Sequence, residues 1–127
     1  MGKYKYVGEF EVNASNKMLY SYIATASGLA QWYADDVNIN SDKDFQIIWD
    51  GEEHLAKMVS HRTNHEVKFE FVSDDPDPNY VKFEILTNEL TQENFLRVTD
   101  YSEIDDQEEL QELWESLVHD LKEIVGG

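Results

Sequence analysis

The sequence predicts an α+β fold in which an antiparallel sheet of about six to seven strands packs against a long C-terminal helix, with two short helices after the first strand. Three observations predict this arrangement. Apolar and polar residues alternate in several segments with the period of two that is typical of half-buried strands. The links between most of these segments are short, which favours antiparallel neighbours. The C-terminal segment instead repeats apolar residues at intervals of three and four, the spacing of an amphipathic helix.

The N-terminal part of the chain is predicted to form one strand and then two helices. The alternation over residues 4–12 gives a strand with one apolar face. Asn13 or Ser15 can cap the helix that follows, and Gly28 is a residue type that commonly ends helices. A second short helix is predicted over residues 29–33, inside the stretch "GLAQWYADDV".

The middle of the chain is predicted to form strands joined by turns. The segments "DGEE" and "DDPDPN" are rich in residues that favour turn conformations. Between and around them, alternating segments predict strands over residues 37–39, 45–50, 55–62, 66–71, 81–85 and 95–101. These strands follow one another as an antiparallel meander.

The C-terminal helix has the clearest pattern in the sequence. Asp105 and Glu108 form a capping box, and further acidic residues lie in the first turn, where the helix dipole favours them. A helix of about 20 residues is about 30 Å long, enough to cross a small sheet. The apolar stripe that should face this sheet consists of Leu110, Leu113, Trp114, Leu117, Val118, Leu121, Ile124 and Val125.

The composition predicts a folded, acidic protein with one domain over residues 1–127. The hydrophobic fraction of 41% is too high for a disordered chain, although the formal net charge is −17. This charge should repel nucleic acid and anionic membranes, and no run approaches the roughly 20 apolar residues of a membrane span. The chain has no cysteine and its N-terminus lacks the apolar core of a signal peptide, so we expect a cytoplasmic protein without membrane insertion. We also expect a monomer.

Four segments in this order resemble the START-like (SRPBCC) superfamily, and within it the bacterial relatives of the activator of the ninety-kilodalton heat-shock protein ATPase. They are "GLAQWYADDV", "FQIIWDG", "VKFEFV" and "LWESLVHDLKEIV", which together extend over essentially the whole chain. The resemblance implies a helix-grip fold, in which a curved sheet holds the long helix. It also implies a cavity between them, which in many relatives takes a lipid, sterol, polyketide or other apolar molecule.

Trp32 and Tyr33 can be placed in two ways within such a fold. They can plug the space between the sheet and the long helix, since burying an aromatic side chain is worth on the order of 1.5–3 kcal/mol without any ligand. They can also form the wall of a ligand pocket. For the second case, the residues expected to line the cavity are Trp32, Tyr33, Trp49, Met58, Phe69, Phe71, Phe83, Arg97, Trp114, Leu117 and Leu121.

We expect neither a metal site nor a cofactor. His54, His61 and His65 lie within twelve residues, and His61 and His65 could approach each other across a hairpin. Neither a third zinc ligand nor a second shell of supporting residues can be placed for this pair. The "DDPDPNY" segment has Tyr80 where a calcium loop needs glycine. No nucleophile elbow, phosphate loop or dinucleotide fingerprint is present, so no catalytic residue is assigned. Arg97 and Asp100 on the last strand are the polar residues most worth locating, because the facing of that strand is ambiguous.

Three functions are consistent with these patterns. The first is a non-catalytic START-like module that binds an apolar small molecule, lipid-like or aromatic, between the sheet and the C-terminal helix. The second is a co-chaperone-like or other protein-interaction module, whose acidic C-terminal helix contacts a basic protein partner. From Asp100 onward the chain has ten acidic residues and one basic residue. The third is a cyclase-like or lyase-like enzyme, for which a buried titrating carboxylate or histidine would be the first sign.

Overall fold

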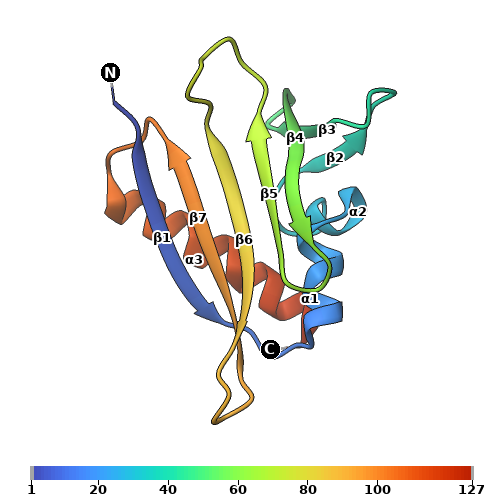
Figure 1. Ribbon diagram of the computed structural model, residues 1–127, viewed down its shortest axis with the longest axis vertical. Coiled ribbons are helices and arrows are strands. Elements are labelled where there is room, and N and C mark those ends of the chain that lie inside the picture. The colour runs from blue at the N-terminus through green and yellow to red at the C-terminus, as the bar shows by residue number, and fades with distance from the viewer. Residues whose placement is uncertain (1, 127) are drawn as a thin grey trace.

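The protein forms a seven-stranded antiparallel sheet with three helices on one side (Figure 1). The computed structural model describes residues 2–126. Its elements are β1 (Tyr4–Glu11), α1 (Asn16–Ile23), α2 (Ala26–Leu29), β2 (Asp36–Ile39), β3 (Phe45–Trp49), β4 (Glu52–Arg62), β5 (Glu66–Phe71), β6 (Tyr80–Thr87), β7 (Asn94–Ser102) and α3 (Gln107–Val125). The strand order is β1-β7-β6-β5-β4-β3-β2, so the predicted meander from β2 to β7 is confirmed and β1 pairs beside β7.

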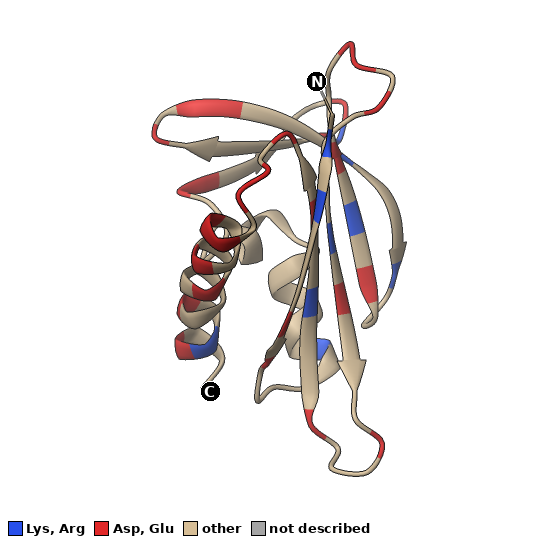
Figure 2. Ribbon diagram, turned by 90° about the vertical axis from the view of Figure 1, so that its left-hand side faces the viewer, with Lys and Arg blue, Asp and Glu red and all other residues tan. Residues whose placement is uncertain are grey.

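The sheet curves around α3, and α1 and α2 lie on the same side of it (Figures 1 and 2). The predicted α+β helix-grip architecture is therefore confirmed. Short turns hold the meander together. At the β3–β4 turn, Asp50 and Gly51 both have positive φ values of 50° and 79°, the requirement of a tight two-residue hairpin turn.

The long helix α3 packs its apolar stripe onto the sheet, as its sequence pattern predicts. Leu110, Trp114, Val118 and Leu121 are buried, whereas Leu113 is 46% exposed. The buried residues lie along the middle of the stripe, and Leu113 lies at its margin. This margin faces the pocket that is described below.

The start of α3 differs by one residue from the predicted capping box. Asp106, not Asp105, is the N-cap, and its Oδ1 accepts a hydrogen bond from the backbone N–H of Glu109 at 3.0 Å. Each aspartate is followed three residues later by a glutamate, so the capping pattern alone does not distinguish them.

The prediction that Gly28 ends the first helix is wrong. Helix α1 ends at Ile23, and Gly28 lies inside α2. Because α2 spans Ala26–Leu29, the predicted helix over residues 29–33 is also wrong except at Leu29. A Cβ atom at Gly28 would lie 2.0 Å from the carbonyl oxygen of Ser21. Gly28 is therefore needed because the backbones of α1 and α2 approach closely, and not because it ends a helix.

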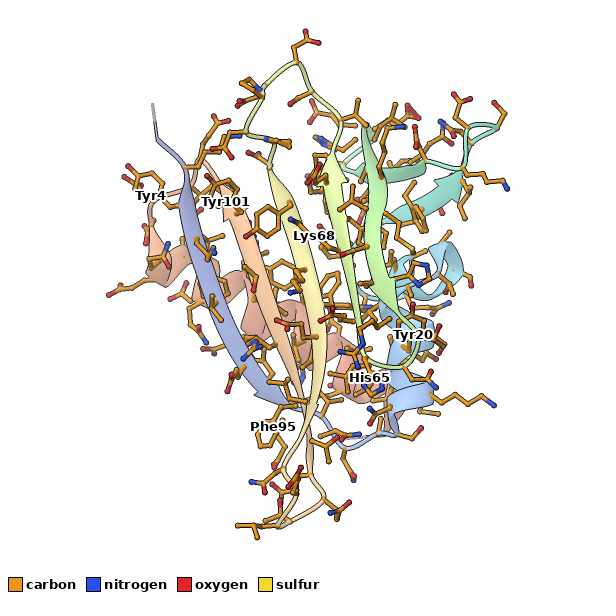
Figure 3. All side chains as sticks on the ribbon, viewed as in Figure 1. Tyr4, Tyr20, His65, Lys68, Phe95 and Tyr101 are labelled. Carbon is orange, nitrogen blue, oxygen red and sulfur yellow. The ribbon has the colours of Figure 1, made fainter. Side chains whose placement is uncertain are left out.

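The two faces of the sheet differ in character. The face toward the helices carries the core, in which Phe69 and Phe83 are fully buried. Lys68 and Tyr101 lie on the opposite face (Figure 3). There the Lys68 ammonium lies 4.1 Å from the centroid of the Tyr80 ring, and Tyr80 stacks on Tyr101. Within residues 2–126, no helix is both long enough and apolar enough to cross a membrane.

Candidate functional site

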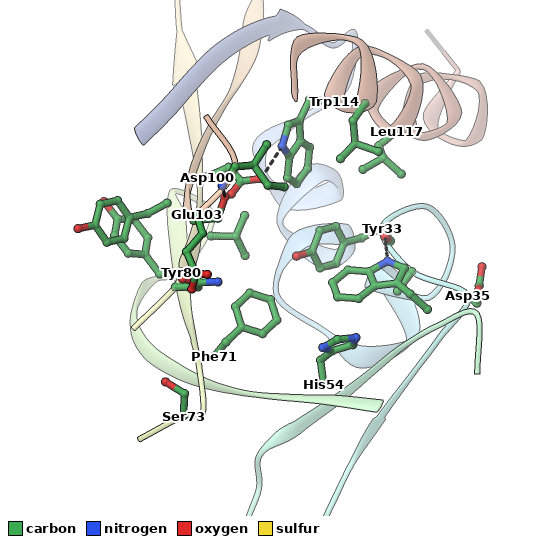
Figure 4. A pocket seen from close by; sticks show the side chains of 18 of the residues that line it. Tyr33, Asp35, His54, Phe71, Ser73, Tyr80, Asp100, Glu103, Trp114 and Leu117 are labelled. Atoms are coloured by element: carbon green, nitrogen blue, oxygen red, sulfur yellow. Dashed lines mark hydrogen bonds between the residues drawn. The ribbon is translucent and has the colours of Figure 1, made fainter. Parts of the chain in front are cut away.

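The main pocket of the protein lies at one end of the space between the sheet and α3 (Figure 4). Its volume is about 1010 Å³, and it opens to solvent. The walls come mainly from the segment between α2 and β2, from the strands β3 to β7 with the β5–β6 loop, and from helix α3. The curvature of the sheet brings these elements together, although they are far apart in the sequence.

Aromatic rings form the inner wall of the pocket. Tyr33 stacks on Trp114, with ring centroids 5.7 Å apart and an interplanar angle of 15°. The same tyrosine meets Trp49 edge to face at 5.2 Å, and Trp49 contacts Phe71 at 6.3 Å. The rings of Tyr33, Phe71 and Trp114 surround a common space (Figure 4). A flat or elongated apolar molecule would find matching surface there.

Hydrogen bonds fix the orientation of all three indole rings. Trp32 donates to the backbone oxygen of Tyr22 at 2.8 Å, and Trp49 donates to that of Tyr33 at 3.0 Å. Trp114 donates to Oδ2 of Asp100 at 3.0 Å. The aromatic wall is therefore held in place by polar contacts as well as by packing, which suits a preformed binding surface.

Asp100 places a carboxylate at the junction of β7 and α3, on the pocket wall (Figure 4). Burial raises the pKa of Asp100, and the hydrogen bonds from Trp114 and Ser102 act in the opposite direction. These donors satisfy the carboxylate, but they bring no positive charge. The charged form of Asp100 is consequently disfavoured where it lies.

Tyr33 presents a hydroxyl group to the same space. The side chain is 5% exposed, and burial, followed by the nearby Asp100 carboxylate, raises the pKa of its phenol. Among residues 2–126, no buried side-chain polar atom lacks a hydrogen-bond partner. The Tyr33 hydroxyl forms no hydrogen bond to another of these residues, and it therefore cannot be one of the fully buried polar atoms. It is accessible from the pocket, toward which it points in Figure 4.

The rim of the pocket combines apolar and acidic side chains. Val72, Ile104 and Leu113 lie on it and are 50%, 43% and 46% exposed. The acidic residues that line the pocket are Asp35, Asp50, Asp75, Asp100, Glu103 and Asp120. Among residues 2–126, Lys3 is the only lysine or arginine that contributes to the lining, and its ammonium lies 3.0 Å from the Asp75 carboxylate.

The pocket brings together six of the eleven residues that the sequence places around a cavity. These are Trp32, Tyr33, Trp49, Phe71, Trp114 and Leu117. Trp32 and Tyr33 are 4% and 5% exposed and belong to the core as well. The two placements considered for these rings, in the core and in the pocket wall, are therefore compatible. One side of these rings packs into the core, and the other side lines the pocket.

The other five residues do not line this pocket. Phe69, Phe83 and Leu121 point to the expected side of the sheet or helix, but they are fully buried in the core behind the pocket. Met58 is partly buried against the same core. Arg97 lies on the outer face of the sheet, where its guanidinium forms two hydrogen bonds to Glu84, at 3.0 and 3.1 Å.

Sequence reasoning missed the acidic lining and the apolar rim. The inward direction of Asp100 can be inferred from the sequence, because Asp100 shares the alternation of Leu96 and Val98, which are buried. The remaining acidic residues lie mostly in turns and in the segments that flank strands, and no periodicity marks them. The histidines do not converge, and residues 2–126 contain no group of three or more potential metal ligands.

This fold and pocket define a class of protein: an α+β helix-grip domain with a cavity beside its C-terminal helix. The sequence profile of the START-like superfamily domain matches residues 1–127. The protein therefore belongs to the START-like superfamily. No curated protein matches the chain.

Solved structures include similar proteins from several bacteria. BfR322 from Bacteroides fragilis is 34% identical, with a TM-score of 0.66 over 98% of this chain and 92% of that chain. The Aha1 dimer from Colwellia psychrerythraea is 18% identical, with a TM-score of 0.75 over 96% of each chain. DynU16, described as a putative protein of the dynemicin biosynthetic locus, is 15% identical, with a TM-score of 0.70 over 94% of this chain and 46% of that chain. The last two show a shared fold only.

Proposed function

We propose that the protein is a non-catalytic START-like module that binds an apolar small molecule, lipid-like or aromatic, between the sheet and α3. The observation that carries this proposal is the pocket of about 1010 Å³ with its wall of Tyr33, Phe71 and Trp114. Small-molecule pockets commonly measure about 300–1,000 Å³ and are lined mainly by apolar and aromatic groups. The exposed apolar rim at Val72 and Leu113 gives such a molecule a surface at the entrance.

A titration with fatty acids, sterols and polycyclic aromatics tests the proposal. A ligand should change the tryptophan fluorescence in a saturable way, because all three indoles, those of Trp32, Trp49 and Trp114, line the pocket. It should also shift the amide resonances of the pocket residues. Ala34→Trp, which places an indole in the pocket, should abolish binding, whereas Val59→Trp, outside the pocket, should not. If no panel member gives saturable shifts at the pocket residues, the proposal is wrong.

A cyclase-like or lyase-like enzyme is another candidate, because the partly buried Asp100 carboxylate lines the pocket and burial raises its pKa. A partly buried carboxylate beside a tyrosine hydroxyl can move a proton to or from a bound cyclic substrate. Incubation of the protein with polycyclic ketones or polyketide mimics, followed by mass spectrometry, distinguishes the two candidates. A product that disappears in Asp100→Asn would favour the enzyme, and unchanged substrate would favour binding alone.

A co-chaperone-like or other protein-interaction module that contacts a basic protein through α3 is a further candidate. Acidic residues lie along the outward side of this helix (Figure 2). A complex held by surface charges should weaken steeply as salt shortens the Debye length from about 10 Å at 0.1 M to about 3 Å at 1 M. Pull-downs at both salt concentrations test this.

We propose a monomer, although the Colwellia neighbour is a dimer, and sedimentation of the purified protein tests that point.

A further inference from the structure

The charges around the pocket are nearly all of one sign. In the part of the chain that the structure describes, six carboxylate side chains and one ammonium group line it. That ammonium, on Lys3, is already paired with Asp75 and bonded to Asn79 at 2.7 Å, so it is committed to the β5–β6 loop. A concave surface lined by one sign of charge concentrates its field inside the cleft. The pocket is thus attractive to a cation and repulsive to an anion.

The most enclosed of these carboxylates adjoins the aromatic wall. Asp100 is bonded to Trp114, whose ring stacks on Tyr33, so the carboxylate and the two rings form one continuous surface. The hydrogen-bond donors of Asp100 are neutral, and no lysine or arginine forms a salt bridge with it among the described residues. A charge held in this way is stabilised by a cation that enters from the pocket.

The aromatic rings favour the same kind of ligand. The face of an aromatic ring attracts an ammonium group, most strongly where water is excluded. Phe71 and Tyr33 lie on the pocket side together with Asp100 (Figure 4). The hydroxyl of Tyr33 adds an acceptor for an N–H donor within the same space. The wall therefore offers ring surface for the apolar part of a ligand and a carboxylate for its charged part.

A fatty acid or a phosphorylated lipid does not fit this lining. An acid group needs a paired base at its binding site, and such pairs commonly involve arginine. Arg97 was expected near the cavity, but it lies on the outer face of the sheet with Glu84 and Glu9. The inner space therefore holds no arginine among the described residues.

We propose that the ligand of this pocket is an apolar organic cation, with an aromatic or aliphatic body against Tyr33, Phe71 and Trp114 and an ammonium group beside Asp100. This inference rests on the proposed function, since it names the class of molecule that the same pocket takes. It separates amines and quaternary ammonium compounds from the neutral and acidic members of the lipid-like class.

Three compounds with the same indole ring and the same two-carbon arm test the charge preference: tryptamine, tryptophol and indolepropionate. They carry a cation, a neutral hydroxyl and an anion at the end of the arm. Calorimetry at low salt measures their affinities, and amide shifts locate their site. Tryptamine should bind at least about ten times more tightly than tryptophol, and indolepropionate should not bind. Added salt should reduce the preference for tryptamine, because it screens the carboxylates.

A pair of matched variants separates the site from the overall acidity of the chain. Asp100→Asn should weaken tryptamine binding by about tenfold and should weaken tryptophol binding much less, because the tryptophol hydroxyl carries no charge. Asp42→Asn removes the same charge from an exposed turn outside the pocket and should change neither affinity. Circular dichroism verifies that both variants are folded.

The outcomes distinguish the two proposals. If tryptophol binds in the pocket as tightly as tryptamine, the ligand is not selected by charge, and the inference is wrong while the proposed function stands. If Asp42→Asn weakens tryptamine as much as Asp100→Asn does, the attraction belongs to the whole chain, which also overturns the inference. If none of the three compounds nor any member of the apolar panel binds, the proposed function is lost together with it.

Discussion

Asp100 is a residue at which binding and stability have opposite requirements. Burial raises its pKa, so folding favours the protonated form. A group whose pKa is higher in the folded state than in the unfolded state contributes its stability below the unfolded pKa, and the contribution is lost as the pH rises through the folded pKa. At neutral pH the ionised carboxylate is therefore a cost to the fold that a bound cation would offset.

Replacing Asp100 by asparagine should stabilise the free protein at pH 7–8 by on the order of 1 kcal/mol. The side-chain oxygen of asparagine can still accept the hydrogen bond from Trp114, while the charge is removed. Urea unfolding measures the difference, which should shrink as the pH falls, because the wild-type carboxyl group then becomes protonated as well. Asp42→Asn is the control. A variant that is less stable at neutral pH, or a difference that grows in acid, would contradict this account.

For single residues, the sequence predicts which side of the sheet a side chain points to better than it predicts how deeply that side chain is buried. Phe69 and Phe71 have the same parity on β5, yet Phe69 is fully buried and Phe71 lines the pocket. The difference depends on how far each residue lies from the open end of the pocket. The alternation of apolar and polar residues along the strand carries no information about this distance. Arg97 was misplaced for another reason. It lies between Leu96 and Val98, both buried, so its own parity points outward.

At the level of elements, Gly28 determines how α1 and α2 pack. A methyl group there would meet the carbonyl oxygen of Ser21 at 2.0 Å and the Cα of Tyr22 at 2.7 Å. These are backbone atoms, which cannot move aside as the end of a flexible side chain can. Trp32 depends on the same contact, because its indole donates to the carbonyl oxygen of Tyr22.

Gly28→Ala should therefore destabilise the protein by about 1–3 kcal/mol, the usual cost of overpacking a close contact. The alternative outcome is a gain in stability. It would occur if α2 tolerated the methyl group, because alanine favours the helical conformation more than glycine does. The urea midpoint distinguishes these results. Gly2→Ala is the matched control, because a Cβ atom at Gly2 meets nothing within 4 Å. Equal midpoints for the two variants would show that α1 and α2 do not pack as described.

The start of α3 gives a second test at this level. Asp106→Ala removes the side chain that accepts from the Glu109 amide and should cost about 0.5–2 kcal/mol. Asp105→Ala removes the same charge beside the same helix end, but no cap, and should change stability by less than about 0.5 kcal/mol. Thermal unfolding of both variants measures the difference. A larger loss for Asp105→Ala would restore the capping box that the sequence pattern suggested.

The order of the elements was predictable because each one has a strong local pattern. The alternations of β5 and β6 and the stripe of α3 each determine a buried face without reference to the rest of the chain. The boundary between α1 and α2 was not predictable in the same way. It depends on a contact between two backbones at Gly28, and a glycine in sequence does not distinguish a helix end from a close approach.

For the molecule as a whole, the dominant electrostatic feature is self-repulsion. The formal net charge of −17 comes from 27 acidic and ten basic residues, so most carboxylates have no cation to pair with. Exposed ion pairs such as Lys57–Asp44, at 3.2 Å, contribute only about 0–1 kcal/mol each. Repulsion among the excess carboxylates acts over longer distances and opposes the compact state. Salt screens both the attraction within the ion pairs and the repulsion among the carboxylates. The repulsion involves more of the charges, so its screening should have the larger effect on stability.

Sodium chloride should therefore stabilise the protein, by on the order of 1 kcal/mol between low salt and about 0.5 M, where the Debye length has fallen to a few ångströms. Urea is the suitable denaturant because it is uncharged and leaves the ionic strength under control. Potassium chloride should act in the same way, since screening does not depend on the identity of the cation. If salt lowers the urea midpoint, the ion pairs outweigh the repulsion. If only one cation raises it, the acidic surface binds that ion, and general screening is not the cause.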